Sequence, residues 1–201
     1  MGKQKYLAEV LGLFQRSPVV SYTSVSNIIK TRKARSQNTK QCIRRLVSSG
    51  KVKRLAKGYY TMHDDPSLLV FCLQPAYLGL QDALSFHNLS EQETIPIIIT
   101  TQRVSQGIRV ILGSNVLIRR INKKYFFGVH YGVQGNIALP YSDIGKTAID
   151  MAYFNQRISR GVLSGIRQGI KKNQVQRYLA RYPKMIRSRI ARVLFEVPKP
   201  R

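Results

Sequence analysis

Acidic side chains are scarce in this sequence. Its 201 residues include 9 Asp and Glu against 34 Lys and Arg, which gives a formal net charge of +25. Residues 1–62 carry 14 basic and 1 acidic side chains, residues 63–154 carry 7 of each, and residues 155–201 carry 13 and 1. A neutral middle between two basic ends predicts a polyanionic partner that is contacted from both ends.

Long apolar runs are missing, and cysteines are few. No run approaches the roughly 20 apolar residues that a transmembrane helix requires, and the first residues do not resemble a signal peptide. We therefore expect no membrane partner, although an anionic membrane is the other polyanion to consider. The two cysteines, Cys42 and Cys72, are too few for a disulfide framework, and both lie in apolar runs. This usage predicts small core residues in a reducing, cytoplasmic compartment.

The sequence has little that indicates an enzyme. No Ser/His/Asp or Cys/His grouping stands out, and no pair of carboxylates followed by a lysine marks a nuclease strand. Gly145-Lys146-Thr147 resembles the end of a phosphate-binding P-loop. However, the position five residues before Gly145 is Pro140, where that loop needs the backbone N–H of a glycine. We expect no catalytic residues and no cofactor.

Histidines offer no clear ligand set either. His63 precedes Asp64, Asp65 and a proline, which could be mistaken for a metal site, but polar residues before a proline are typical of a turn. His87 and His130 are expected to be structural. We therefore predict no metal site, and we take the turn at His63 as a domain boundary.

Residues 36–62 predict a helix followed by a tight hairpin. Ser36 can cap the helix, because its side-chain oxygen can accept a bond from a first-turn N–H. Gly50 can end it in the left-handed conformation. At helical spacing, the apolar side consists of Cys42, Ile43, Leu46 and Val47. The opposite face consists of Gln37, Gln41, Arg44, Arg45 and Ser48, with Asn38 at its edge.

This polar face suits a nucleic-acid groove. Gln and Asn can pair with adenine edges, Arg with guanine edges or phosphates, and Ser with either. The β-rich runs 52–55 and 59–62 flank a turn that contains Gly58, which predicts a hairpin. A helix followed by a basic hairpin is the end of a winged helix-turn-helix. The simpler interpretation is an ordinary amphipathic helix with a solvated basic face.

Two further helices are predicted upstream, at about residues 5–15 and from Tyr22 or Thr23 onward. We expect the basic run at residues 30–35 to lie along phosphates, where the release of condensed counterions drives binding. Together these features predict a winged helix-turn-helix DNA-binding domain over residues 1–62. The predicted DNA-binding residues are Arg32, Lys33, Arg35, Ser36, Gln37, Asn38, Lys40, Gln41, Arg44, Arg45, Lys53, Arg54, Lys57 and Tyr59.

Residues 63–154 predict a small α+β domain. An apolar run ends at Pro75, a helix is expected at residues 77–87, and another at 142–154 closes the domain. Short apolar runs separated by Gly, Asn, Ser and Lys favour an antiparallel sheet. The predicted strands are residues 95–100, 108–112, 116–121, 125–131 and 137–139.

Residues 155–201 predict a basic helical C-terminal region. Gly161, Gly165 and Gly169 recur every four residues and would line one stripe of a helix. Each glycine costs roughly 1 kcal/mol in a helix interior relative to alanine. The stripe therefore indicates close approach by a neighbouring helix, a partner subunit or a phosphate chain, unless the segment is partly irregular.

The charge of this region predicts a second nucleic-acid surface. Its candidate residues are Arg160, Arg167, Lys171, Lys172, Arg187, Arg189 and Arg192. The alternative is structural: the glycines and the apolar stripe of Ile186, Ile190 and Leu194 pack on the α+β domain, and the arginines face water.

Several short motifs carry a resemblance to a known family. They are Lys57-Gly58-Tyr59-Tyr60, Asp82-Ala83-Leu84-Ser85-Phe86-His87-Asn88-Leu89, the strands ending at Phe127-Gly128, and Lys146-Thr147-Ala148-Ile149-Asp150-Met151-Ala152-Tyr153-Phe154. From about Tyr6 to Phe154 the chain resembles the AbiEi-type antitoxins and transcriptional regulators of type IV toxin–antitoxin modules.

The resemblance implies an N-terminal winged helix paired with a small α+β domain. It further implies a repressor that binds a double-stranded DNA operator with repeats in its own operon. Such a protein opposes a nucleotidyltransferase-like toxin encoded beside it, and does not need a stable complex with that toxin. One alternative is a DNA-binding regulator of a mobile element with no toxin partner. The other is an RNA-binding protein, which is less favoured because Tyr59 and Tyr60 alone do not form a platform for stacking unpaired bases.

Overall fold

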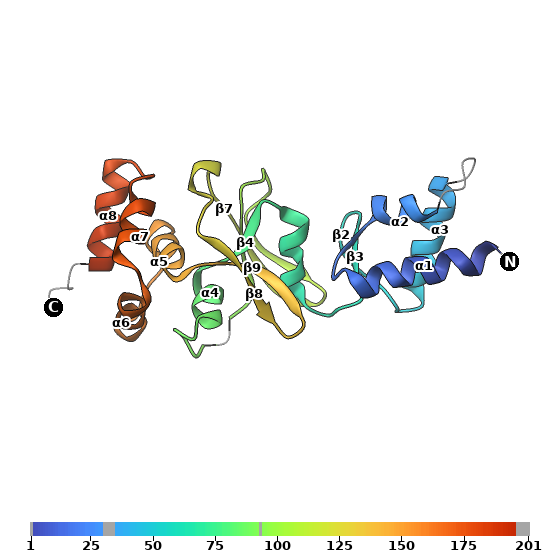
Figure 1. The fold of residues 1–201 in the computed structure, drawn as a ribbon, viewed down its shortest axis with the longest axis horizontal. Helices are drawn as coiled ribbons and strands as arrows, with labels where there is room; N and C mark the ends of the chain where they lie inside the picture. Colours follow the sequence, from blue (N-terminus) through green and yellow to red (C-terminus); the bar gives the residue numbers. More distant parts are fainter. Residues whose placement is uncertain (1, 30–34, 93, 196–201) are drawn as a thin grey trace. The chain divides into compact units, whose positions relative to one another are not determined.

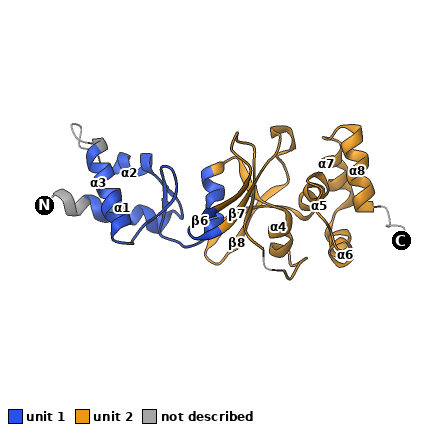
Figure 2. Ribbon diagram, turned by 180° about the vertical axis from the view of Figure 1, so that it is seen from behind, with its two compact units in different colours: residues 1–72, 110–114 blue, residues 73–109, 115–201 orange. Residues whose placement is uncertain are grey.

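The computed structural model describes residues 2–29, 35–92 and 94–195 (Figure 1). The chain divides into two compact units (Figure 2). Unit 1 comprises residues 1–72 and 110–114, and unit 2 comprises residues 73–109 and 115–201. Both contain helices and strands, so the predicted α+β class is confirmed. Residues 63–72, which the sequence placed in the second domain, cluster with unit 1, and residues 155–201 cluster with unit 2.

Unit 1 contains three helices and a small sheet, and local signals set their ends. Helix α1 stops before Pro18, and Ser21 caps α2 by accepting a bond from the N–H of Ser24 at 3.0 Å. Helix α3 stops before Gly50, whose φ of +69° is the left-handed conformation that the sequence predicts there. The elements are α1 Gly2–Arg16, β1 Val20–Ser21, α2 Tyr22–Ile28, α3 Arg35–Ser48, β2 Lys53–Ala56 and β3 Tyr59–Thr61.

The sheet of unit 1 has the strand order β1-β3-β2, and both pairings are antiparallel. The hairpin β2–β3 lies where the sequence predicts it, whereas the two-residue strand β1 was not predicted. Buried side chains from all three helices pack together, among them Val10, Phe14, Val25, Ile43 and Leu46. This core fixes which side of α3 faces the interior.

Beyond β3 the chain continues through short elements into unit 2. The first of them is the 3-10 helix η1 Pro66–Leu73. The strands are β4 Ala76–Leu78, β5 Ile97–Thr100, β6 Gly107–Ile111, β7 Ser114–Arg120, β8 Val129–Gln134 and β9 Ile137–Ser142. The helices are α4 Leu80–Phe86, η2 Lys123–Tyr125, α5 Ile144–Tyr153, α6 Arg160–Gly169, α7 Lys172–Leu179 and α8 Lys184–Phe195.

The six-stranded sheet has the order β6-β7-β5-β4-β9-β8 and is mixed. The antiparallel sheet predicted from the sequence is therefore wrong. Strand β4 pairs in parallel with β9, and β5 pairs in parallel with β7, while β4–β5 and β8–β9 are antiparallel. Short runs separated by turn residues predict strands but not partners, and parallel pairs arise here between strands that are separated by other elements.

Two element assignments also change in unit 2. Tyr77 lies in β4 rather than in a helix, and α4 begins only at Leu80. Residues 125–131 were predicted as one strand, but η2 ends at Tyr125 and β8 begins at Val129. Both regions are apolar runs of a few residues, whose length does not distinguish a strand from a turn of helix.

Helix α5 lies at the centre of the helical part of unit 2. It contacts α4, α6, α7, α8 and β9, and Figure 1 shows it between the sheet and α6–α8. Buried residues of the C-terminal helices share one core with α5 and the sheet, including Leu163, Ile166, Val175, Leu179, Ile190 and Leu194. The C-terminal helices are thus an integral part of the hydrophobic core of unit 2.

The glycine stripe lies on one regular helix, α6. A Cβ at Gly165 would approach Leu89 Cδ2 to 3.0 Å, and a Cβ at Gly169 would approach Ile144 Cδ1 to 2.9 Å, whereas Gly161 has nothing within 4 Å. Two of the three glycines therefore allow close approach to side chains of the same unit.

Candidate nucleic-acid interface

The polar face of α3 is exposed as its spacing predicts. Side chains from each turn of the helix reach solvent, and Thr39, Ile43 and Leu46 lie on the buried side. The exposed residues are Gln37, Lys40, Gln41, Arg44, Arg45 and Ser48, with Asn38 half-buried at the edge. Helix α3 thus presents a continuous row of hydrogen-bond donors and cations.

Val47 departs from the predicted pattern. The sequence places it on the apolar side of α3, but its side chain is 38% exposed. Val47 lies at the edge of the buried side of α3, and the centre of that side is formed by Ile43 and Leu46. Val47 lines a surface groove instead.

The hairpin residues differ in how available they are. Lys53 forms an ion pair with Asp64, and its side chain is 39% exposed. Arg54 on β2 and Lys57 in the turn are exposed, and Tyr59 is half-buried. Arg54 and Lys57 are therefore the hairpin cations best placed to meet a partner.

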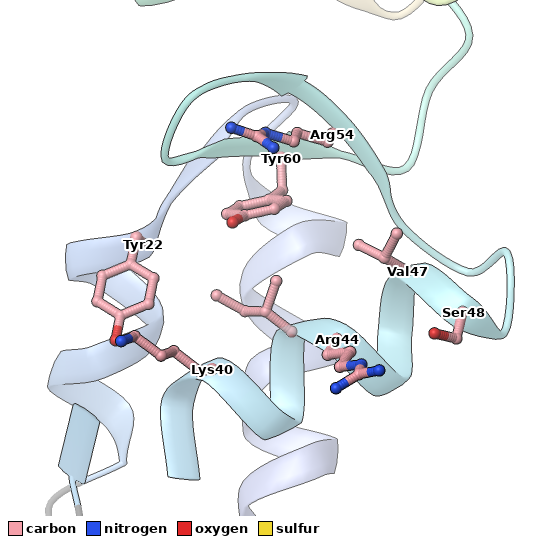
Figure 3. A pocket seen from close by; sticks show the side chains of 8 residues that line it. Tyr22, Lys40, Arg44, Val47, Ser48, Arg54 and Tyr60 are labelled. Carbon is pink, nitrogen blue, oxygen red and sulfur yellow. The ribbon is translucent and has the colours of Figure 1, made fainter. Parts of the chain in front are cut away.

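A groove of about 270 Å³ lies between α2, α3 and the hairpin (Figure 3). Arg54 and Tyr60 face each other as cross-strand partners on β2 and β3, and Tyr60 points from the hairpin toward α3 (Figure 3). The lining residues are Tyr22, Lys40, Ile43, Arg44, Val47, Ser48, Arg54 and Tyr60. Tyr22 and Tyr60 were not predicted as site residues, although the alternation of Tyr59 and Tyr60 on one strand implies that they point to opposite faces.

The cations of the groove have no counter-charge within the described residues. No ion pair joins Lys40, Arg44 or Arg54 to a carboxylate in residues 2–29, 35–92 and 94–195. The two carboxylates next to the hairpin are occupied: Asp64 pairs with Lys53, and Asp65 accepts the N–H of Ser67 at 2.8 Å. The groove therefore has an uncompensated positive charge that favours an anionic ligand.

Several predicted residues cannot be placed at this interface. Arg32 and Lys33 lie outside the described residues. Arg35 and Ser36 belong to α3, but their side chains are likewise outside the described part. Since α3 already begins at Arg35, Ser36 lies inside the helix and the predicted N-cap at Ser36 is wrong.

The predicted second basic surface separates into two kinds of residue. Arg167 is half-buried, and its Nε donates to the carbonyl of Leu194 at 2.7 Å. Arg189 donates from Nη2 to the carbonyl of Tyr153 at 3.1 Å. Both tie one helix to another. The remaining members, Arg160, Lys171, Lys172, Arg187 and Arg192, are exposed.

A recess of about 480 Å³ lies at the start of α7. The sequence predicted Lys171 and Lys172 as surface cations but missed Arg177, which lines the same recess with Asn173 and Gln174. Arg177 lies four residues beyond Asn173 and three beyond Gln174, so the helical period could have identified it as their neighbour.

The P-loop-like segment is part of the core. Lys146 and Asp150 are fully buried and form an ion pair, and the Tyr77 hydroxyl donates to Asp150 Oδ2 at 2.7 Å. The hydroxyl of Thr147 donates to the carbonyl of Asp143 at 2.8 Å. Lys146 therefore cannot reach a nucleotide phosphate.

The cysteines are free thiols, and both are half-buried rather than part of the buried core that the sequence predicts for them. Burial raises the pKa of Cys42, and it raises the pKa of Cys72 to about 12. Over the described part of the chain, there is no group of three or more His, Cys, Asp or Glu that could hold a metal ion. The same residues include no helix with the length and apolar character needed to span a bilayer.

The chain matches no family model and no curated protein. Among solved structures it is similar to the crystal structure of the RV2827C protein from Mycobacterium tuberculosis, with a TM-score of 0.60 and 14% sequence identity. The similarity covers 94% of this chain and 76% of that one. At this identity the two proteins share a fold over most of their length, and the likeness extends no further than the fold.

Proposed function

We propose that this chain is a sequence-specific DNA-binding transcriptional repressor that acts as the antitoxin of a type IV toxin–antitoxin module and represses its own operon. The observation that carries the DNA-binding part is the exposed row of Gln, Arg and Ser side chains on α3. Next to it lies a groove whose cations form no ion pair with any carboxylate that the structure describes. This arrangement favours a nucleic acid, which is a polyanion whose base edges can form hydrogen bonds with such side chains.

In this proposal unit 1 is a winged helix-turn-helix. Helix α3 is the recognition helix, and the hairpin β2–β3 is the wing. The major groove of B-DNA is about 12 Å wide and admits an α-helix. Gln41 and Arg44 would then face base edges, while Arg54 and Lys57 would contact the phosphates that flank the groove.

The antitoxin part rests on the resemblance to the AbiEi type. Two of its motif residues in unit 2 form hydrogen bonds within the fold. Asp82 Oδ2 accepts the N–H of Ile97 at 3.1 Å, and His87 Nε2 lies 2.8 Å from the carbonyl oxygen of Ser142. Because these hydrogen bonds join α4 to β5 and to the end of β9, proteins that share these motifs would be expected to share the fold. Any antitoxin action would then involve the exposed surface of the protein.

The DNA-binding proposal is tested by titrating the full chain against a duplex from upstream of its own gene and against a scrambled duplex, at one fixed salt concentration. Gln41→Ala and Arg44→Ala should each reduce the ratio of the two affinities, because a good bidentate base contact discriminates by about 1–3 kcal/mol. Arg16→Ala, on α1, is the control and should leave the ratio unchanged. An unchanged ratio in both α3 variants would remove α3 as the reading element.

The antitoxin proposal needs a separate measurement. A nucleotidyltransferase-like gene adjacent to this one would be expressed alone and together with the parent chain or Arg44→Ala, from promoters that the chain does not regulate. Growth should be restored by both chains, because removing one base contact leaves unit 2 intact. Growth arrest that persists in the presence of the parent chain would refute the antitoxin role and leave the repressor role standing.

A further inference from the structure

The recess at the start of α7 is a concentration of positive charge on unit 2. It is lined by Lys171, Lys172 and Arg177 together with two amide side chains, and none of the lining residues in the described part of the chain is acidic. Residues 155–195 hold 11 basic and no acidic side chains. The charge of the recess is therefore not balanced by the helices that carry it.

The carboxylate that accepts hydrogen bonds from α7 is that of Asp143, and both of its oxygens are already engaged. Asp143 caps α5 by accepting the N–H of Lys146 at 2.7 Å. Its other oxygen accepts bonds from Gln174 Nε2 at 3.0 Å and from the Tyr178 hydroxyl at 2.7 Å. Since these donors come from α7 itself, Asp143 anchors the helix and leaves the lysines exposed.

Helix α7 is held firmly enough to present a fixed surface. Val175 is completely buried, and Leu179 is 6% exposed. A Cβ at Gly145 would lie 3.1 Å from Val175 Cγ2, and one at Gly128 would lie 3.1 Å from Tyr178 Cε2, so glycines at both positions let α7 pack closely. Because the backbone of α7 is fixed before binding, only the cationic side chains lose conformational entropy when they bind.

Other basic residues of this region serve the fold. Arg167 and Arg189 donate to backbone carbonyls, and the Arg181 guanidinium lies 4.6 Å from the centre of the Phe127 ring. The recess cations, in contrast, form no ion pair within the described residues. This difference separates cations that hold helices together from cations that are available to a ligand.

We infer that the α7 recess is a second DNA-contacting surface, one that binds the phosphate backbone of a duplex without reading its sequence. This inference rests on the proposed function of unit 1, because two contacts on one chain raise the effective concentration of each for the same duplex. Lysines act as point charges toward phosphate. None of the described residues that line the recess is aromatic, so this lining offers no stacking surface of the kind that readers of single-stranded RNA use.

The test compares two full-chain variants with the same change in net charge. Lys171→Glu/Lys172→Glu/Arg177→Glu alters the recess, and Arg103→Glu/Arg120→Glu/Lys123→Glu alters exposed residues elsewhere in unit 2. Each is titrated against the upstream duplex, the scrambled duplex and a single-stranded RNA over a range of salt concentrations. A neutral variant, Lys171→Gln/Lys172→Gln/Arg177→Gln, is titrated in the same way. The melting temperature of every variant is measured to check that it is folded.

The recess variant should bind both duplexes at least about tenfold more weakly than the control variant at low salt. The slope of log affinity against log salt should fall by about 0.9 for each phosphate that the chain no longer neutralises, which is about 2–3 in total. The affinity ratio of the two duplexes should stay that of the parent. The neutral variant should show the same direction with a smaller loss.

Equal duplex binding by the recess and control variants would overturn the inference while leaving the α3 reader intact. A loss confined to RNA would also overturn it, since the recess would then serve a different polymer. If the α3 variants keep their sequence preference while the recess variant loses affinity for both duplexes, the inference stands and the assignment of α3 fails. A parent chain that binds neither duplex would refute both.

Discussion

Lys146 and Asp150, one turn apart on α5, form an ion pair from which solvent is entirely excluded. The Tyr77 hydroxyl donates to the same carboxylate, and the Lys146 ammonium lies 4.9 Å from the centre of the Phe127 ring. Burial raises the pKa of Asp150 and lowers the pKa of Lys146, while their mutual attraction opposes both shifts. Each charge in the core of unit 2 therefore depends on the other.

Asp150→Asn should destabilise unit 2 strongly, because it leaves the Lys146 ammonium buried without a counter-charge. Removal of one partner from a buried pair typically costs about 3–5 kcal/mol of unfolding free energy. Asp64→Asn is the matched control. It removes the partner of Lys53 from an exposed pair, which should cost at most about 1 kcal/mol. Denaturant unfolding followed by circular dichroism measures both, and equal losses would show that the buried pair contributes no more than a surface pair.

Gly128→Ala should destabilise the protein more than Gly135→Ala. Both glycines have positive φ, +66° and +59°, so each substitution carries backbone strain of roughly 1–2 kcal/mol. Only at Gly128 would the new Cβ also meet neighbours, 2.9 Å from Lys146 Cβ and 3.0 Å from Asp143 Oδ2. Overpacking there should add about 1–3 kcal/mol. Thermal melting of the two variants decides the point, and matching melting temperatures would contradict it.

The pH dependence of stability should include a contribution from His130. Partial desolvation and then the charge of His87 lower the pKa of His130, although its side chain is exposed, and Asp143 opposes the shift. The unfolded chain therefore binds more protons than the folded one as the pH falls below about 6.5, and the free energy of unfolding decreases. His130→Gln should flatten the decline in melting temperature between about pH 7 and about pH 5. His63→Gln, at an exposed turn, should not, and identical profiles for the two variants would exclude His130.

Arg54 and Lys57 should contribute to affinity without contributing to sequence preference. Alanine at either position should weaken all duplexes alike and reduce the salt slope by close to one for each phosphate interaction removed. Lys53→Ala should have a smaller effect, because Lys53 is engaged with Asp64. Titrations of the three variants against the upstream and scrambled duplexes provide the measurement. A loss limited to one duplex would show that the hairpin reads bases.

Features with local causes could be predicted from the sequence. Pro18 ends α1 and Gly50 ends α3, because each residue restricts or permits a particular backbone conformation at its own position. The exposed face of α3 follows from helical spacing alone. Val47 was misplaced because spacing identifies the direction of a side chain but not how far the neighbouring hairpin extends over it.

Features with distant causes could not be predicted. Strand β4 is three residues long, and its partners come from β5 and β9, so no periodicity marks it. Arg167 and Arg189 are indistinguishable in sequence from the exposed arginines of the tail. Their roles depend on carbonyl groups 27 and 36 residues away. Contacts at such separations leave no pattern in a single sequence.

The apolar sides of α6–α8 complete the core of unit 2, while the outer sides of the same helices carry cations and no acids. Folding therefore brings like charges together, and whatever neutralises them also favours the folded state. A polyanion that binds only the native form raises stability by RT ln(1 + [L]/Kd). The melting temperature of the whole chain therefore reports how much polyanion is bound. It should rise when a phosphate polymer is added, and it should rise least in the variant whose α7 charges are reversed.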